Sequence, residues 1–294
     1  MKRVYTIMFF ISLAVFVASV AALAVYRLNF GVDFKGGSIM ELEFAQERPV
    51  TDDVQKVLKE KFPNIGEFNI NQVGERGLIL RSEELSEELH QEILGVINSD
   101  FSGFEEKRFD SVGPTVGREL RNKSIIAIVI VLAAIACYVA FVFRKLSKTL
   151  PLWAMNASAL VGLLHDIVIP MGVFAVLGRY YNVEISAVFV AAVLTILGYT
   201  VSDKVVIFDR VRENILKGDK GDLGSIVHKS VMQTLVRSIN NTLTVVLSSL
   251  AIYLFGGESI RYFALALMIG IFLGAYSSIF VASPLLVWWS KKRG

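Results

Sequence analysis

The stretch SIIAIVIVLAAIACYVAFVF, residues 124–143, is a run of 20 side chains without a single charge, and nearly all of them are apolar. An α-helix rises ~1.5 Å per residue, so ~20 apolar residues cross the ~30 Å hydrocarbon layer of a bilayer. A helix that is apolar on every side for this length has no water-facing surface. The run therefore predicts a transmembrane helix.

The same pattern recurs five more times along the chain. The residues are 54% hydrophobic and 19% charged, whereas soluble proteins average ~25% charged residues. A single Asp166 interrupts one run and a single Arg237 another, and both runs are long enough to remain one span each. The further uncharged runs are residues 5–26, 151–165 with 167–178, 185–202, 230–236 with 238–257, and 262–290. These runs predict six transmembrane helices.

The placement of Lys and Arg predicts the orientation, because short cytoplasmic loops are enriched in basic residues. The short loops on the other side contain only Arg179 and Arg261. Both termini are therefore predicted to be cytoplasmic, and the long segment after the first span to be exported. The predicted cytoplasmic side carries Lys2, Arg3, Arg144, Lys145, Lys148, Arg210, Arg212, Lys217, Lys220, Lys229, Lys291, Lys292 and Arg293.

The first span could instead be a cleavable signal peptide, since two basic residues precede it and small residues occur at 18–22. Its uncharged length of residues 5–26 exceeds the usual ~7–15 residues of a signal core. We therefore interpret it as a retained membrane helix.

The segment between the first two spans has the pattern of a small folded domain. Met40, Leu42 and Phe44 alternate with polar residues, as expected for a half-buried strand, and a helix from Asp52 with Thr51 as its cap should follow. Strands near 67–72, 78–81 and 104–109 and a helix over 84–98 complete the order βαββαβ, which is typical of a ferredoxin-like sandwich. The predicted domains are residues 1–27 (first span), 28–121 (exported α+β domain) and 122–294 (five-helix bundle with a cytoplasmic loop around 209–229).

No catalytic pattern is present in the exported segment. His90 has no metal-ligand or triad neighbours at a useful spacing, and the carboxylates around it indicate a solvated helix face. We expect no cofactor, no metal site, no nucleic-acid partner and no enzymatic reaction.

Charged residues inside the spans need a partner or a function, because an ionised side chain at the centre of a span costs ~2.5–3.5 kcal/mol on insertion scales. Asp203 lies six residues before Asp209, and Arg237 lies eight residues after Lys229 on the following span. At ~1.5 Å per residue the two charges reach nearly equal depth, ~9 and ~12 Å. If their helices are neighbours, carboxylate and guanidinium can pair, either as an ion-responsive switch or as a static pair that only fixes helix register.

Asp166 lies near the middle of the third span, 15 residues after Pro151. An ion path could meet Asp166 before Asp203, but His165 or a backbone carbonyl could also satisfy this carboxylate locally. We interpret His165 as a hydrogen-bonding residue rather than a proton carrier. Lys204 follows Asp203 directly but points ~100° away from it around the helix.

Four motifs in order resemble those of the SecD/SecF family of the RND superfamily. Residues 31–37, GVDFKGG, resemble its DFxGG motif, and residues 112–117, VGPTVG, resemble its VGPxxG element. Leu164-His165-Asp166 is similar to its third-span HD motif. Residues 198–214, GYTVSDKVVIFDRVREN, resemble its GYSxNDTVVVFDRIREN block, with Ser202 and Lys204 where the family has Asn and Thr.

The resemblance implies an RND-type half with a periplasmic domain in the bacterial inner membrane, working with SecD, the SecYEG channel, SecA, a YajC-like accessory subunit and an unfolded translocating polypeptide. It implies that Asp203 and Arg237 are ion-pathway residues, for H⁺ or Na⁺, and we expect Asp166 to feed this pathway. Asp33, Phe34, Gly36, Gly37, Gly113, Pro114 and Gly117 are then motif residues, which we interpret as hinges or tight crossings.

Two other functions remain in view. A passive scaffold subunit that stabilises SecD and the channel would need no ion, and Asp203→Asn would leave export normal. An RND small-molecule exporter is disfavoured because one small exported domain leaves little room for a drug pocket.

Overall fold

The computed structural model describes residues 3–66, 68–101, 103–144, 150–219 and 221–290. Glu67, the first residue of one predicted strand, lies outside this set, and so do the basic residues Lys2, Lys145, Lys148, Lys220, Lys291, Lys292 and Arg293. The chain divides into two compact units, one formed by residues 30–124 and the other by residues 1–29 together with 125–294.

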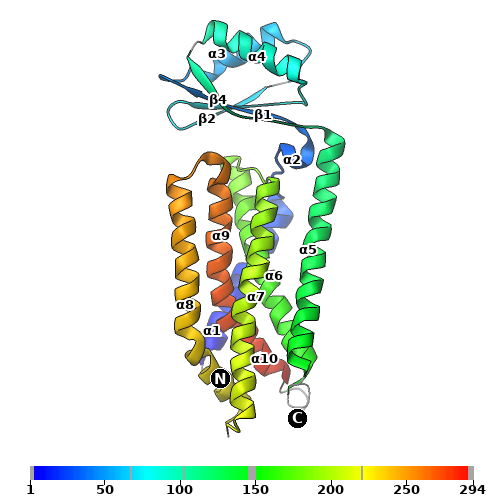
Figure 1. Ribbon diagram of the computed structural model, residues 1–294, viewed down its shortest axis with the longest axis vertical. Helices are drawn as coiled ribbons and strands as arrows, with labels where there is room; N and C mark the ends of the chain where they lie inside the picture. Colours follow the sequence, from blue (N-terminus) through cyan, green and yellow to red (C-terminus); the bar gives the residue numbers. More distant parts are fainter. Residues whose placement is uncertain (1–2, 67, 102, 145–149, 220, 291–294) are drawn as a thin grey trace. The chain divides into compact units, whose positions relative to one another are not determined.

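Within these described residues, six helices are long and apolar enough to cross a membrane, as predicted. They are α1 (Arg3–Tyr26), α5 (Pro114–Phe143), α6 (Leu152–Tyr181), α7 (Ala187–Leu216), α8 (Leu223–Phe255) and a sixth span built from α9 (Glu258–Ser277), a π-helical turn (Ser278–Ala282) and α10 (Ser283–Ser290). They run alternately up and down, so the start of α1 and the end of α10 lie at the same end of the bundle (Figure 1).

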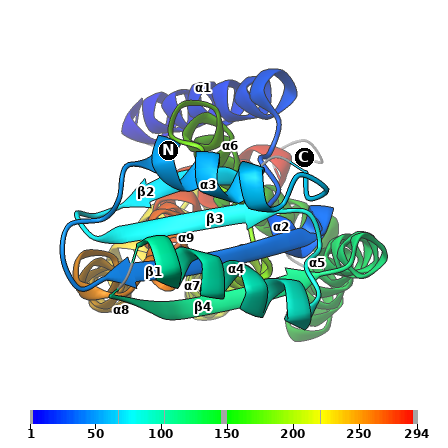
Figure 2. The same ribbon diagram turned by 90° about the horizontal axis from the view of Figure 1, so that it is seen from above.

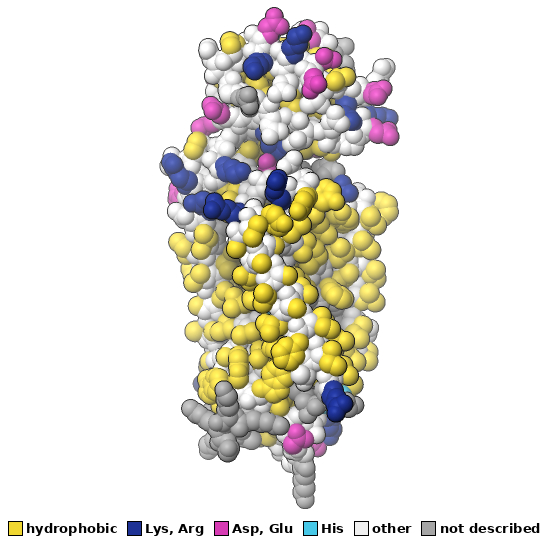
Figure 3. All heavy atoms as spheres, turned by 180° about the vertical axis from the view of Figure 1, so that it is seen from behind, with side chains coloured by type: hydrophobic (Ala, Val, Ile, Leu, Met, Phe, Trp, Pro, Cys, Tyr) yellow, Lys and Arg dark blue, Asp and Glu magenta, His cyan; other side chains and the backbone are white. Residues whose placement is uncertain are grey.

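Apolar side chains cover the outside of the bundle. Figure 3 shows them as a continuous band around the helices on one face, where lipid would lie in a membrane. Their exposure is large: Phe10 is 59% exposed on α1 and Ile130 is 60% exposed on α5. In water such a band would be an aggregation site, whereas lipid solvates it without cost.

Small residues allow the central helices to approach closely. A side chain on Gly274 of α9 would collide with Thr200 of α7, and one on Gly270 with Ile196 one turn away. A Cβ on Gly172 of α6 would lie only 2.5 Å from the Cβ of Ser19 on α1. Without a hydrophobic driving force between helices in lipid, this close van der Waals packing is what holds a bundle together.

The sixth span is not a regular α-helix throughout. Its π-helical turn, Ser278–Ala282, directly precedes Ser283 and Pro284. Proline has no N–H to donate and its ring collides with the carbonyl four residues earlier, so the helix widens by one residue at this point. The Ser283 hydroxyl donates to the Ser278 carbonyl at 2.7 Å and thereby satisfies one of the carbonyl groups of the widened turn.

The polar segment around residues 209–229, predicted as a loop, is largely helical. Helix α7 continues to Leu216 and α8 begins at Leu223, with Asp222 as its N-cap accepting from the Gly224 N–H. Polar residues of high helix propensity continue a helix beyond the hydrocarbon layer, and Gly218, at φ +78°, marks its end.

The unit of residues 30–124 contains a four-stranded antiparallel sheet in the order β2-β3-β1-β4. The strands are β1 (Gly37–Phe44), β2 (Asn69–Val73), β3 (Gly77–Ser82) and β4 (Phe104–Val112). Helices α3 (Thr51–Lys61) and α4 (Glu87–Asp100) lie on one face of the sheet (Figure 2). With the order βαββαβ along the chain, this is the ferredoxin-like topology that the sequence predicts.

The helices of this domain begin close to where they were predicted. Val50, not Thr51, is the N-cap of α3, and no side chain caps this end. The prediction of Thr51 as the cap was wrong, because the helical backbone already starts there. Ser86 caps α4 by accepting from the Leu89 N–H at 3.4 Å. The helix itself begins at Glu87, three residues after its predicted start at residue 84.

His90 is buried rather than part of a solvated face. It is 4% exposed and stacks on Phe109 with ring centroids 3.6 Å apart. Its Nε2 lies 2.7 Å from Glu106 and its Nδ1 lies 3.3 Å from Glu87. Hydrogen bonds from Gln91 and His90 hold the pKa of the Glu87 carboxyl below its usual range. The two carboxylates thus satisfy a histidine that joins α4 to β4.

Candidate functional site in the helical bundle

A buried chain of polar groups joins α1, α6 and α7. The Lys204 Nζ on α7 donates to Asp166 Oδ2 on α6 at 2.6 Å, and both side chains are completely buried. Asp166 Oδ1 lies 3.3 Å from the Nδ1 of His165, whose Nε2 lies 2.6 Å from the Ser12 hydroxyl on α1. The carboxylate can only accept, so Nδ1 donates to it; in a neutral His165, Nε2 then accepts from Ser12.

Several features of α6 make room for this ion pair. A Cβ on Gly162 would lie 2.5 Å from the Lys204 Cε, so the lysine stem crosses α6 where that helix has no side chain. Gly162 and Asp166 are four residues apart and share one face of the helix. Pro170 has no N–H for the carbonyl of Asp166, four residues earlier. The proline therefore leaves one backbone carbonyl at the level of the charges without its helical N–H partner, although α6 stays α-helical throughout.

His165 is fixed in place by two aromatic rings. The rings of Phe16 on α1 and Tyr276 on α9 lie nearly parallel to its ring, at 6.3 and 6.4 Å between centroids and at interplanar angles of 8° and 16°. The Tyr276 hydroxyl donates to the Met8 carbonyl of α1 at 2.8 Å. This packing supports the interpretation of His165 as a hydrogen-bonding residue.

Asp203 is in a different environment from its neighbour Lys204. It is 8% exposed, and its Oδ2 has no hydrogen-bond partner in the described part of the chain. Ser238 of α8 lies beside this carboxylate. The hydroxyl oxygens of Thr200, Ser238 and Thr242 are also buried without a partner among the described residues. Buried polar oxygens are nearly always paired, so these two helix faces form a polar site that suits a cation or water.

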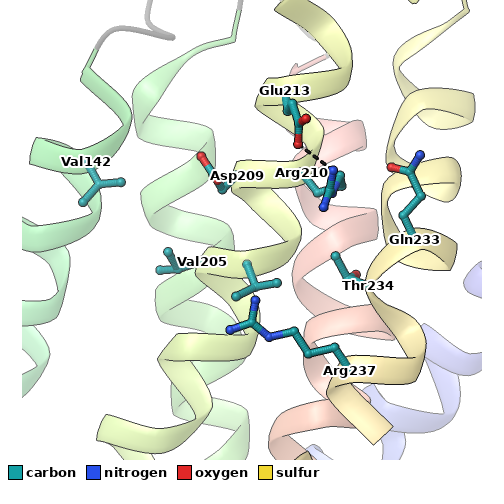
Figure 4. A pocket seen from close by; sticks show the side chains of 9 residues that line it. Val142, Val205, Asp209, Arg210, Glu213, Gln233, Thr234 and Arg237 are labelled. Carbon is teal, nitrogen blue, oxygen red and sulfur yellow. Dashed lines mark hydrogen bonds and ion pairs between the residues drawn. The ribbon is translucent and has the colours of Figure 1, made fainter. Parts of the chain in front are cut away.

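Arg237 does not pair with Asp203. Among the described residues, the ion pairs within 4 Å include none between them. Figure 4 shows the Arg237 side chain extending from α8 toward α7, in a cleft of about 360 Å³. Glu213 and Arg210, which also line this cleft, pair with each other at 2.6 Å. The remaining lining residues are Val142, Val205, Val206, Asp209, Gln233 and Thr234.

A polar stripe faces outward on α7 and α8 within the predicted spans. Its members are exposed: Thr195, Ser202, Arg237, Asn240, Asn241 and Thr244. Facing lipid, such groups would be costly, whereas a second polar helix surface could satisfy them. The cleft and this stripe lie on the same two helices.

The glycine motifs of the ferredoxin-like domain pack against each other. Gly36 has φ +85° and ψ 164°, and a Cβ there would lie 2.6 Å from the Pro114 Cα. A Cβ on Gly117 would lie 3.0 Å from the Gly36 nitrogen and 3.1 Å from the Phe34 carbonyl carbon. Gly37, at φ +122°, pairs with Val112 at the start of β1. The motif residues from 34 to 117 thus form one tight backbone junction, with Asp33 in the short helix α2 (Val32–Lys35) and Gly113 next to Glu84.

The arrangement defines a class of protein: a multispan membrane protein with ionisable groups buried in a helical bundle and a ferredoxin-like domain between its first two spans. The sequence profile described as "Protein export membrane protein SecD/SecF, C-terminal" matches residues 94–292, and that of the "SecD/SecF GG Motif" matches residues 21–47. The chain belongs to the SecD/SecF family of protein export membrane proteins, as a SecF-type translocase subunit.

Individual relatives agree with this assignment. The protein translocase subunit SecF of Thermobaculum terrenum is 40% identical, over 97% of this chain and 92% of that protein. The protein translocase subunit SecDF of Brucella abortus is 36% identical, over 90% of this chain and 34% of that protein. The crystal structure of SecDF from Thermus thermophilus, a translocon-associated membrane protein, is similar with a TM-score of 0.84 and 31% identity, over 98% of this chain and 38% of that one.

Sequence reasoning placed Asp166, Asp203 and Arg237 inside the bundle but missed the partner of Asp166. The departure of Lys204 from the family motif was the signal for this pair. Gly162, four residues before Asp166 in an apolar run, was a second signal, since a glycine there leaves space for a neighbouring side chain.

Proposed function

We propose that this SecF-type subunit couples the inward movement of a monovalent cation, H⁺ or Na⁺, to late steps of Sec-dependent protein export across the bacterial inner membrane. Asp203 is the carboxylate that the cation binds, and Arg237 in the neighbouring cleft is the charge that responds to it. The observation that carries the proposal is the buried Asp203 oxygen without a partner, among the unpaired hydroxyl oxygens of α7 and α8.

The energetics favour such a site. A buried carboxylate oxygen without a hydrogen-bond partner is costly while the group is ionised, and an arriving cation neutralises it. Each elementary charge that moves through 100 mV releases ~2.3 kcal/mol, which is enough to bias a helix rearrangement over repeated cycles. Binding at Asp203 would therefore change how α7 packs against α8.

The polar stripe on α7 and α8 supports a second membrane half as partner. SecD is our candidate, since SecDF relatives hold the SecF-like part in a longer chain of which this sequence covers 34–38%. We include the SecYEG channel, SecA, a YajC-like subunit and the unfolded translocating polypeptide as the further partners that the family resemblance implies. In this proposal both termini lie in the cytoplasm, and the domain of residues 28–121 lies in the periplasm.

The glycine junction has a mechanical role in this proposal. Gly36 against Pro114, and Gly117 against Phe34, allow no side chain between their backbones. Such a junction transmits a shift of the start of α5 to β1 and β4 rather than absorbing it. We therefore assign it as a tight crossing instead of a flexible hinge.

The test is Asp203→Asn in inner-membrane vesicles that import a secreted protein under a controlled cation gradient. We expect loss of the gradient-dependent part of export, while copurification with SecD stays normal. Asp219→Asn is the control, because this carboxylate lies just after the same helix, is not among the residues that line the cleft, and pairs with Lys229 at 2.9 Å. Normal gradient dependence in Asp203→Asn with an assembled complex refutes the proposal.

A passive scaffold role is the second candidate, and one observation favours it. Asp203 and Arg237 form no ion pair, and Asp166 is already neutralised by Lys204, so part of the buried charge is structurally accounted for. In a scaffold, Asp203→Asn would export normally, and substitutions in the stripe, such as Asn241→Leu, would reduce assembly.

A further inference from the structure

We propose that Lys204 is a tethered cation that occupies the position of a free monovalent cation at Asp166. In this chain Asp166 is therefore closed to the coupling ion, and removing the ammonium group converts Asp166 into a binding site for H⁺ or Na⁺. The inference deepens the proposed function and rests on it only in taking such a cation as the coupling species.

The geometry shows a site built around the ammonium group. The Nζ to Oδ2 distance of 2.6 Å is that of a charge-assisted hydrogen bond, and neither side chain is exposed at all. The lysine stem crosses α6 at Gly162, where a Cβ would lie 2.5 Å from the Lys204 Cε. A lysine held only by a chance surface contact would not need a backbone gap for its stem.

The other groups at Asp166 leave one cationic position to fill. His165 supplies a hydrogen bond to Oδ1 and is itself held by Ser12, Phe16 and Tyr276. Oδ2 is bound by Lys204. The titratable groups that face Asp166 are thus His165, Lys204, Tyr276 beyond the histidine, and Asp203 on the adjacent helix. With Lys204 removed, Oδ2 is a buried anionic oxygen whose charge must be balanced by a cation from outside, either Na⁺ or a proton taken up by Asp166 or by His165.

On this assignment Asp166 and Asp203 have different roles, because Lys204 and Asp203 point in different directions from α7. Lys204 and Asp203 are consecutive on α7, so their side chains point ~100° apart, toward α6 and α8 respectively. The ammonium group satisfies Asp166, while Asp203 Oδ2 has no partner among the described residues. The structure thus contains one carboxylate with a built-in cation and one that can bind a mobile cation.

The experiment measures thermal unfolding of the full chain in lipid nanodiscs, in choline chloride at pH 8, in sodium chloride at pH 8, and in choline chloride at pH 5. The wild type gives the reference response, which includes any binding of sodium or protons at Asp203. Lys204→Met should unfold roughly 5–15 °C lower in choline at pH 8. Sodium or acid should restore at least half of that loss. Lys204→Gln, which retains a hydrogen-bond donor without charge, is measured in parallel so that a foldable variant is available.

Second substitutions identify the site that responds. Adding Asp166→Asn to Lys204→Met should return the unfolding temperature close to that of the wild type and reduce the response to sodium and acid to the wild-type response. Adding Asp203→Asn should leave the response in place. Lys217→Met, which breaks the exposed Lys217–Glu213 pair on the same helix, is the matched control and should change little.

The inference is overturned if Lys204→Met and Lys204→Gln unfold like the wild type, if neither sodium nor acid relieves their loss, or if the response disappears with Asp203→Asn instead of Asp166→Asn. None of these measurements uses protein export. Failure of the tethered-cation assignment and failure of ion-coupled export at Asp203 are therefore recorded by different assays.

Discussion

Replacing Gly36 by alanine should open the junction between β1 and the start of α5. The backbone at Gly36, φ +85° and ψ 164°, belongs to a region that is essentially restricted to glycine, at a cost of about 1–3 kcal/mol for other residues. The new Cβ would also lie 2.6 Å from the Pro114 Cα and 2.8 Å from its nitrogen. Such overpacking against backbone costs about 1–3 kcal/mol more. The expected total is about 2–6 kcal/mol.

Hydrogen exchange of the β1 and β4 amides in the full chain measures this loss directly. At 1.4 kcal/mol per factor of ten, these amides should exchange about 30-fold faster or more. Gly74→Ala is the control, because Gly74 also has a positive φ, +58°, but has no atom within 4 Å of its Cβ position. If the β1 and β4 amides of Gly36→Ala exchange no faster than those of Gly74→Ala, the close approach of the two motifs carries no energetic weight and the reasoning fails.

Three further substitutions follow from the packing. Gly95→Ala on α4 meets no atom within 4 Å, so it should stabilise the domain by about 0.5–1 kcal/mol, seen as a higher denaturation midpoint; a lower midpoint would contradict this. His90→Ala should cost about 1–3 kcal/mol in the same assay, since its stacking on Phe109 is lost and two carboxylates lose their partner. Gly274→Leu should separate α9 from α7 and reduce the yield of folded protein, whereas Gly198→Leu, with nothing near it, should not; equal yields would argue against close packing there.

Much of the fold could be predicted from local sequence patterns. Runs such as residues 124–143 exclude any location but a membrane, and the alternation at Met40, Leu42 and Phe44 fixes which face of β1 is buried. Hydropathy identifies the residues that lie in the hydrocarbon layer, but it does not identify the residue at which a helix ends. That is why the segment around 209–229 was predicted as a loop although most of it is helical.

The candidate site was only half predictable, because position along a helix and direction around it are separate quantities. Counting residues placed Asp203 and Arg237 at equal depth. Direction around α8 puts Ser238, not Arg237, beside Asp203, and Arg237 points into the cleft. The same separation of ~100° between consecutive residues sends Lys204 to Asp166 and not to the site of Asp203.

The widened turn before Pro284 has a consequence for insertions and deletions. One extra residue in a helix advances the following side chains by ~100°, because 3.6 residues complete a turn. The buried face of α10, which includes Leu286 and Val287, is therefore set by the length of the segment before it as much as by its own composition. The π-helical turn itself takes up one extra residue, so deleting one residue among 278–282 should leave a regular helix with that face in place. Deleting one residue from a regular part of the span, such as residues 263–277, would instead turn that face away from its neighbours and be far more disruptive than most point substitutions there.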